Sequence, residues 1–146
     1  MELKVKTFGE LNTHELYEIA RARTEIFLME QKIICRDLDG IDYDSLHCFL
    51  EEDGQIKAYL RAYVTDAKEK TVKIGRVLSI THGIGLGTRL MKESIAEIKK
   101  RTCCKKIVVN AQKHAQKFYE SIGFATVSDD FLEEGIVHIA MELQTP

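Results

Sequence analysis

Three glycines at alternate positions, Gly83, Gly85 and Gly87, lie between a strand-like run and a helix-like run of the sequence. Glycine is required where a side chain would keep a ligand away from the backbone. The first turn of a helix also presents unpaired N–H groups that attract anions. The spacing therefore predicts a loop that holds a phosphate or pyrophosphate, although an ordinary turn fits the glycines equally well when they are considered alone.

Two common nucleotide-binding motifs do not fit this loop. The dinucleotide fingerprint G-x-G-x-x-G fails because Thr88 stands at its third glycine, and because the strands ahead of the loop follow a hairpin order. The Walker loop fails because no Gly-Lys-Ser/Thr follows the glycines. A phosphate-bearing ligand held mainly by backbone N–H groups is the remaining functional interpretation.

The elements that position this loop follow from the hydrophobic pattern. Alternation predicts a strand at residues 2–8, a capping box opens a helix over 13–30, and Asp53-Gly54 predicts a hairpin between strands at 46–52 and 55–64. A strand at 71–80 contains Gly75, which indicates a bulge or a splayed end. A helix over 88–101, a strand over 106–110, a short helix over 114–122 ended by Gly123, and strands around FATVSD and GIVHIAMEL complete the chain.

This order, βαβββαβαββ, predicts an α+β fold with three α/β/α layers. Its central sheet would be mixed and mostly antiparallel, with helices on both faces, because the late strand, helix, strand unit requires a parallel crossover. The chain has 146 residues, 45% of them hydrophobic, and no low-complexity tract. We therefore expect residues 1–146 to form a single domain.

Charge and composition exclude several classes of partner. The formal net charge is -2 and the charges are interspersed, so there is no basic stripe for nucleic acid. No segment approaches the roughly 18 apolar residues of a membrane helix, and the N-terminus lacks an apolar signal region. We expect a cytoplasmic protein without a membrane partner. Its cysteines lack CxxC spacing, and we expect Cys35, Cys48, Cys103 and Cys104 to be reduced thiols.

Two motifs, in this order, resemble the GCN5-related N-acetyltransferases, or GNAT family. The end of the family loop Gln/Arg-x-x-Gly-x-Gly/Ala corresponds to His82–Gly87, and the hallmark A-x-x-F/L-Y-x-x-x-G-F corresponds to Ala115–Phe124. Further segments, among them Ile26–Gln31, Gly75–Val77 and Glu134–Ile139, resemble an ElaA-like branch of that family. Two departures are His82 in place of Gln or Arg and a short link from Arg76 to His82.

The resemblance implies acetyl-CoA as cosubstrate and no metal. The pyrophosphate would bind the loop, with Arg89 able to add charge, and the acetyl carbonyl would lie near the N–H groups of Val77 and Leu78. Tyr119 would protonate the departing thiolate, and Gln112 or Asn110 would hold the pantetheine arm. The cofactor-binding residues implied are Val77, Leu78, His82, Gly83, Ile84, Gly85, Leu86, Gly87, Thr88, Gln112 and Tyr119.

The acceptor amine must lose a proton, because an alkyl amine with a pKa of about 10.4 is almost fully charged at pH 7. The candidate bases are Glu30, His47, Asp37, Asp39 and His138, of which we count Glu30 and His47, with Tyr119, as the catalytic set. Glu30 could instead be solvated or paired with Arg23, and the histidines could be hydrogen-bonded core residues or, with a carboxylate, zinc ligands.

Two arginines, Arg61 and Arg76, fall on neighbouring strands and could meet the acidic turn at residues 37–42. We favour a tie that holds the turn to the sheet over a pocket for an acidic acceptor. Tyr59 and Tyr63 share the face of Arg61 and could line a pocket or only pack against a helix.

The leading functional prediction is acetyl-CoA-dependent N-acetyltransfer to an amine of a small molecule or a protein. We expect direct attack in a ternary complex, because no cysteine lies in a nucleophile motif. The alternatives are a CoA-binding sensor or interaction module that has lost turnover, which His82 favours, and a structural domain whose loop binds nothing. Family domains often pair, so a homodimer is a further expectation.

Overall fold

A computed structural model describes residues 1–146 as one sheet of eight strands with helices on both faces. The strands are β1 (Leu3–Thr7), β2 (Leu46–Glu52), β3 (Gln55–Asp66), β4 (Thr71–Ser79), β5 (Lys106–Gln112), β6 (Ala125–Thr126), β7 (Phe131–Glu133) and β8 (Ile136–Gln144). The helices are α1 (Thr13–Arg23), α2 (Leu86–Thr102) and α3 (Gln116–Ile122), and a π-helical turn, Thr24–Glu30, continues α1. Short 3-10 turns are formed by Phe8–Glu10, Ile41–Asp44 and Lys113–Ala115.

The strand order is β1-β2-β3-β4-β5-β8-β6, with β7 paired to β8. Only β4 and β5 run parallel, because α2 carries the chain from one to the other; every other pair is antiparallel. The predicted α+β class and mixed, mostly antiparallel sheet are confirmed. One edge of the sheet is β1, and the other is formed by the short strands β6 and β7, both of which pair with β8.

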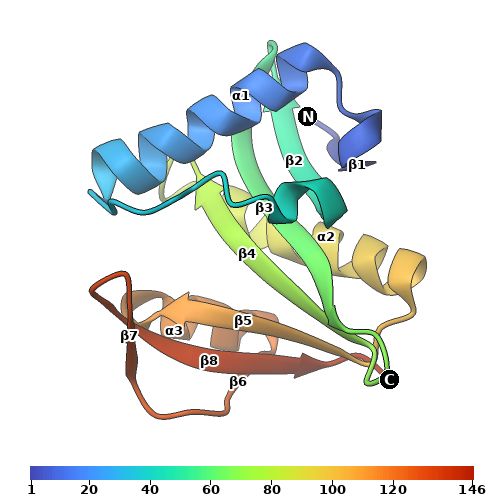
Figure 1. Ribbon diagram of the computed structural model, residues 1–146, viewed down its shortest axis with the longest axis vertical. Helices are drawn as coiled ribbons and strands as arrows, with labels where there is room; N and C mark the ends of the chain where they lie inside the picture. Colours follow the sequence, from blue (N-terminus) through green and yellow to red (C-terminus); the bar gives the residue numbers. More distant parts are fainter.

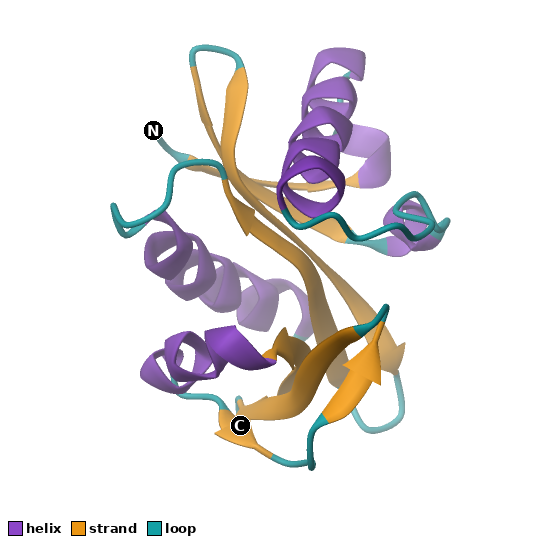
Figure 2. Ribbon diagram, turned by 90° about the vertical axis from the view of Figure 1, so that its left-hand side faces the viewer, coloured by secondary structure: helices purple, strands orange, loops and turns teal.

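Two apolar clusters hold the helices on opposite faces. α1 packs on β2 and β3 through Ile19 and Phe49, which belong to a cluster of seven buried residues. The larger cluster, of nineteen, joins α2 and α3 to the other face, with Leu90 and Ile107 fully buried. Figure 1 shows α1 in front of the upper strands and α2 behind the sheet. Figure 2 shows the strands lying between the helices on either side, so the three predicted layers are present.

The local signals for helix boundaries act as expected. The Asn12 side chain accepts from the backbone N–H of Glu15 at 2.7 Å, and the Glu15 carboxylate accepts from the N–H of Asn12 at 3.0 Å. This reciprocal cap satisfies donors at the start of α1. The C-terminal end of α3 is set by Gly123, whose φ of 119° is a conformation that favours glycine. α2 extends slightly beyond its predicted ends.

A three-residue strand, β7, was not predicted. It is too short to show alternation, and its turn to β8 depends on positive φ at Glu134 (52°) as well as at Gly135 (75°). The β7–β8 hairpin carries Glu133 and Glu134 toward the C-terminal ends of β5 and β4. None of the helices is long and apolar enough to cross a membrane.

The sheet splits where β4 and β5 separate. They pair only from Thr71 with Lys106 to Ile74 with Val109, and then diverge, as Figure 1 shows. At this point β4 also bulges. Arg61 of β3 pairs with Gly75 of β4 and Tyr59 pairs with Leu78, so β4 has one more residue than β3 between these two pairs. The predicted bulge lies at Arg76, beside Gly75, and Arg76 has a positive φ of 54°. The divergence leaves β4 without a neighbour on its β5 side.

Candidate functional site

The divergence of β4 and β5 opens two adjoining cavities, of about 510 Å³ and 370 Å³. Val77 on β4, Ala115 before α3 and Tyr119 on α3 line both of them. The larger cavity extends toward the acidic turn and the β7–β8 hairpin, and the smaller one toward the glycine loop. A long ligand could therefore lie with one end on the loop and the other beside Tyr119.

The glycine loop exposes its backbone at the start of α2. Gly83 and Gly85 both have φ of 80°, and a Cβ added at either would meet nothing within 4 Å. Gly85 caps the helix, so the N–H groups of Leu86, Gly87 and Thr88 have no partner within it. Gly87 differs, because a Cβ there would touch the Phe118 ring at 3.5 Å. The first two glycines leave the N-terminus of α2 open, and the third allows α3 to pack closely.

The charged side chains of the loop are already engaged. His82 donates through Nε2 to the Glu30 carboxylate at 3.0 Å, and both side chains are largely exposed. Arg89 pairs with Glu93 at 2.7 Å and donates to the carbonyl of Met1. Glu30 lines neither cavity. The pairing of Glu30 is therefore with His82, a predicted cofactor residue, and not with Arg23.

Tyr119 lies at the junction of the two cavities and is 6% exposed. Its ring packs edge-on between Phe118 and Phe124, with centroids at 5.2 and 5.7 Å. Its hydroxyl makes no hydrogen bond to the chain, and burial raises the pKa of the phenol above its ordinary value of 10.0. Tyr119 therefore keeps its proton at neutral pH and can give it to a group in the cavity.

The unpaired edge of β4 offers backbone donors to the cavity. Along β4, successive N–H groups point alternately toward β3 and away from it. Just beyond the end of β4, the N–H of Ile80 points toward β3, because it donates to the Lys57 carbonyl at 2.9 Å. Leu78 is paired with Tyr59 in the same register, so its N–H points to β3 as well. The N–H of Val77 consequently faces the divergence, whereas that of Leu78 does not. Of the two predicted carbonyl-binding residues, the geometry favours Val77.

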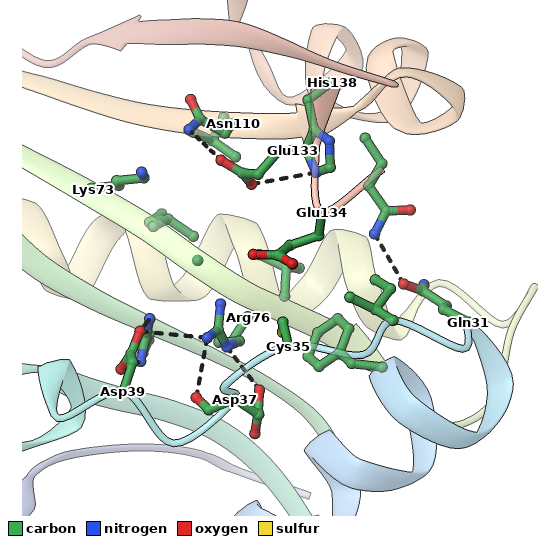
Figure 3. Close-up of a pocket in the computed structure, with 18 of the residues that line it drawn as sticks. Gln31, Cys35, Asp37, Asp39, Lys73, Arg76, Asn110, Glu133, Glu134 and His138 are labelled. Atoms are coloured by element: carbon green, nitrogen blue, oxygen red, sulfur yellow. Dashed lines mark hydrogen bonds and ion pairs between the residues drawn. The ribbon is translucent and has the colours of Figure 1, made fainter. Parts of the chain in front are cut away.

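A hydrogen bond crosses the mouth of the divergence. The Gln112 amide, at the end of β5, donates to the Gln31 side chain at 2.9 Å and accepts from Nε2–H of His114 at 2.7 Å. Figure 3 shows Gln31 meeting its partner from the segment after α1. Asn110 donates to Glu133 at 3.2 Å. Gln112 is thus well placed beside the cavity, but its amide is engaged within the chain.

His47 lies outside both cavities and is 1% exposed. Its Nε2–H donates to the carbonyl of Asp42 at 2.9 Å, which leaves Nδ1 to accept from the Tyr59 hydroxyl at 2.7 Å. Burial lowers the pKa of the imidazole. Both ring nitrogens are occupied, one by the 3-10 turn Ile41–Asp44 and one by Tyr59, so the geometry is that of a hydrogen-bonded core histidine and leaves no free base.

Four residues that sequence patterns did not associate with the site line the larger cavity: Cys35, Lys73, Glu133 and Glu134. Figure 3 shows them with His138, which had been one of several candidate bases. Burial raises the pKa of the Cys35 thiol, with Arg76 acting in the opposite sense, so the thiol is not an activated nucleophile. No group of three or more His, Cys, Asp or Glu side chains is arranged to hold a metal ion.

Comparison with known proteins agrees with this geometry. The model of the acetyltransferase (GNAT) domain family matches residues 18–145, which include the glycine loop, the β4 bulge and Tyr119. Protein ElaA of Escherichia coli is 32% identical over 91% of this chain and 90% of its own length. This chain belongs to the GNAT superfamily, in its ElaA-like branch. It is therefore an acyltransferase of the GNAT type.

Other relatives match over almost their full lengths. A UPF0039 protein of Schizosaccharomyces pombe is 35% identical over 99% of this chain and 97% of its own. The crystal structure of an acyl-CoA N-acyltransferase from Pseudomonas aeruginosa superposes with a TM-score of 0.90 at 35% identity, covering 97% of this chain and 99% of that one. The crystal structure of E. coli ElaA gives a TM-score of 0.89 at 30% identity, with 97% of both chains covered.

In this GNAT domain a network of three arginines and three aspartates borders the larger cavity. Its members are Arg23, Arg61, Arg76, Asp37, Asp39 and Asp42. Arg61 meets both oxygens of Asp39 at 2.8 Å, and Asp42 accepts from Arg23 at 2.6 Å and from Arg61 at 3.1 Å. Figure 3 shows Arg76 reaching the same acidic turn. Formal charges cancel, so the predicted tie of the turn to the sheet is the role that the contacts support.

Replacing Asp42 by asparagine is expected to lower the free energy of unfolding by about 3 kcal/mol, because it leaves buried Arg23 and Arg61 short of a carboxylate. Burial opposes ionisation of Asp42, but hydrogen bonds from the two arginines outweigh it and lower the pKa. The loss should therefore be full above about pH 4 and fade as pH falls further. Urea denaturation from pH 7 to pH 3 measures this. Asp44→Asn, an exposed neighbour, is the control; equal stabilities of the two variants would contradict the prediction.

Proposed function

We propose that this protein transfers the acetyl group of acetyl-CoA to a primary amine of a small molecule or a protein, by direct attack in a ternary complex. The observation that carries the proposal is the common wall of the two cavities, formed by Val77, Ala115 and Tyr119. It joins an anion-binding helix end to a buried proton donor along one path. The larger cavity then supplies room for the acceptor on the side of the acidic turn.

The residues fit acetyl-CoA at both ends. The N–H groups of Leu86, Gly87 and Thr88 hold the pyrophosphate, and no side chain at Gly83 or Gly85 stands in the way. The unpaired β4 edge beyond Ile74 suits the amide arm of the pantetheine, and Gln112 binds that arm after releasing Gln31. The N–H of Val77 donates to the acetyl oxygen and stabilises the negative charge that develops there.

Tyr119 donates its proton to the CoA sulfur as the thiolate leaves. A free thiol has a pKa of about 8.5, below that of the phenol, so transfer to a solvated thiolate would be uphill. The apolar surroundings that raise the pKa of Tyr119 also raise that of a thiol next to it. A free thiolate is therefore costly in this apolar site, and the proton passes from Tyr119 to sulfur as the carbon–sulfur bond breaks, so that no separate thiolate has to form.

The test is thiol release from acetyl-CoA in the presence of a panel of primary amines, together with calorimetric titration of acetyl-CoA alone. We expect binding, and thiol release that depends on both substrates with intersecting double-reciprocal lines. Binding without turnover for any amine would favour the sensor or interaction module. Parallel lines would contradict direct attack in a ternary complex.

Glu30→Gln is expected to tighten acetyl-CoA binding by about two- to threefold. The substitution removes an exposed negative charge beside the pyrophosphate loop and frees His82 from its pairing, which at the surface is worth under about 1 kcal/mol. Calorimetry at low and high salt measures the change, which should shrink as salt screens the charges. A fall in kcat of a hundredfold would instead support the catalytic role that the sequence suggested for Glu30.

A further inference from the structure

His138 is a buried histidine of the larger cavity that the proposed reaction has not yet used. It lies on β8 opposite Gln112 of β5, is 6% exposed, and lines the same cavity as Val77 and Tyr119. Its ring stacks on Phe131 of β7, with centroids at 6.0 Å. The β7–β8 hairpin therefore fixes the imidazole at the wall of the acceptor half of the cleft.

The hydrogen bonds of His138 define which nitrogen is a base. Nδ1 lies 2.8 Å from the carbonyl oxygen of Ile136, and a carbonyl only accepts, so Nδ1 carries the proton. In the neutral imidazole Nε2 then holds the lone pair. Nε2 has no hydrogen-bond partner of its own, in contrast to both nitrogens of His47. The ring is thus held in the tautomer that a proton acceptor needs.

One carboxylate lies beside this nitrogen, and a second lines the same cavity. Glu133 Oε2 lies 3.5 Å from His138 Nε2, and its other oxygen accepts from Asn110 at 3.2 Å, which holds the side chain in place. Glu134, at the hairpin turn, also lines the cavity and forms no ion pair with the chain; Figure 3 shows its carboxylate pointing into the open space. The acidic turn on the opposite wall is neutralised by its arginines. The hairpin is therefore the part of the cavity suited to an alkylammonium.

The geometry points to His138 as the general base of the acetyl transfer, with Glu133 stabilising its charged form and Glu134 as a binding group for the ammonium form of the acceptor. The inference rests on the proposed function, because it presupposes an acetyl thioester beside Val77 and Tyr119. Glu133 lies on the Nε2 side of the ring, where its negative charge stabilises the imidazolium after Nε2 has taken the proton, and the Ile136 carbonyl holds Nδ1–H on the other side.

Protons and electrons balance in this scheme. His138 Nε2 takes one proton from the ammonium group, and the freed nitrogen pair forms the bond to the acetyl carbon. The carbon–sulfur bond then breaks, its electron pair leaves with sulfur, and Tyr119 supplies the proton of the thiol. The second proton lost by nitrogen restores Tyr119 through solvent, and the imidazolium returns its own proton to solvent. The net change is release of one proton for each acetyl group transferred.

The test uses butylamine as acceptor, so that no natural substrate need be known. Thiol release at a fixed high butylamine concentration is measured for wild type, His138→Gln, Glu133→Gln and, as a matched control, His14→Gln. His14 is exposed and bonds the Gly54 carbonyl, away from both cavities. We expect His138→Gln to lower the rate at pH 7 about 100-fold, Glu133→Gln to lower it less, and the control to leave it unchanged.

The pH profile separates a base from a structural residue. In His138→Gln the rate should rise about tenfold per pH unit toward pH 10, as the amine in solution loses its proton, whereas the wild-type rate should level off at lower pH. Other charged or titratable side chains line the same cavity, and the profile includes them all: Glu133 and Glu134 on the hairpin, Lys73 and Arg76 on β4, Arg61 and Tyr63 on β3, Cys35, Arg36, Asp37 and Asp39 before β2, and His114 and Tyr119 after β5. The melting temperature of each variant shows whether it is folded, and its affinity for acetyl-CoA shows whether the cofactor site is intact.

Two results would overturn the inference. One is a His138→Gln rate within about threefold of wild type in a variant that binds acetyl-CoA. The other is a wild type that binds acetyl-CoA but does not accelerate thiol release with butylamine at any pH from neutral to about 10, where the amine is largely neutral. Failure of the folded wild type to bind acetyl-CoA would remove the proposed function itself, and is separately visible in the calorimetry.

Discussion

Tyr119→Phe should lower kcat for acetyl transfer by about 100-fold or more, with the affinity for acetyl-CoA unchanged. The substitution removes only a hydroxyl that forms no hydrogen bond within the chain, and the ring stays packed between Phe118 and Phe124. Folding should therefore be unaffected, and the loss should fall on the step in which sulfur leaves. Steady-state thiol release with saturating acetyl-CoA measures it.

The matched control is Tyr17→Phe, because Tyr17 is 68% exposed on α1 and remote from the cleft. Since burial raises the pKa of Tyr119, the wild type should not lose activity through ionisation of this phenol near pH 10, where an ordinary tyrosine is half ionised. A Tyr119→Phe rate within about threefold of wild type would exclude Tyr119 as the proton donor and leave solvent in that role.

Gly85→Glu should abolish measurable acetyl-CoA binding, a loss of at least about 100-fold. The new carboxylate would stand at the N–H groups of Leu86, Gly87 and Thr88 and compete with the pyrophosphate for them. The φ of 80° adds about 1 kcal/mol of backbone strain, which the favourable charge at a helix N-terminus partly offsets. The variant is therefore expected to fold, and calorimetric titration measures its affinity.

Two further variants separate the causes. Gly85→Ala carries the strain without the charge and should weaken binding only a few-fold, by about 1 kcal/mol at most. Gly54→Glu carries the same charge at another glycine of positive φ, 76°, in the β2–β3 turn, and should bind normally. Unchanged affinity in Gly85→Glu would show that the pyrophosphate lies elsewhere.

Local patterns predicted the fold well where a residue type has a specific structural role, such as capping a helix or forming a tight turn. Asn12 and Glu15 cap α1, Gly123 ends α3, and Asp53-Gly54 turns the β2–β3 hairpin, all as the sequence indicated. β7 was missed because its three residues are too few for a periodic pattern and its turn requires a positive φ at Glu134. Local signals therefore located elements, and missed one that exists only through pairing.

The site was less accessible to sequence reasoning on the acceptor side. The glycine loop and Tyr119 belong to the two motifs that resemble the GNAT family, and it was this resemblance that predicted their meeting along one ligand. His47 and His138 both lie in strands beside apolar neighbours, and nothing local distinguishes them. Only the tertiary arrangement does: both nitrogens of His47 are bonded, to Asp42 and Tyr59, whereas His138 lines the cleft. Glu133 becomes part of the site only because β7 pairs with β8.

The most direct measurement is an amide NMR titration of the ¹⁵N-labelled protein with acetyl-CoA. The account predicts that the largest shifts fall on Leu86, Gly87 and Thr88 at the start of α2 and on Val77 in the diverging part of β4, with Leu78 much less affected. The same ligand would then touch both ends of the path between the loop and Tyr119. Shifts confined to the loop, or centred on the α1 face around Phe49, would contradict the claim that one cleft holds the pyrophosphate and the acetyl group together.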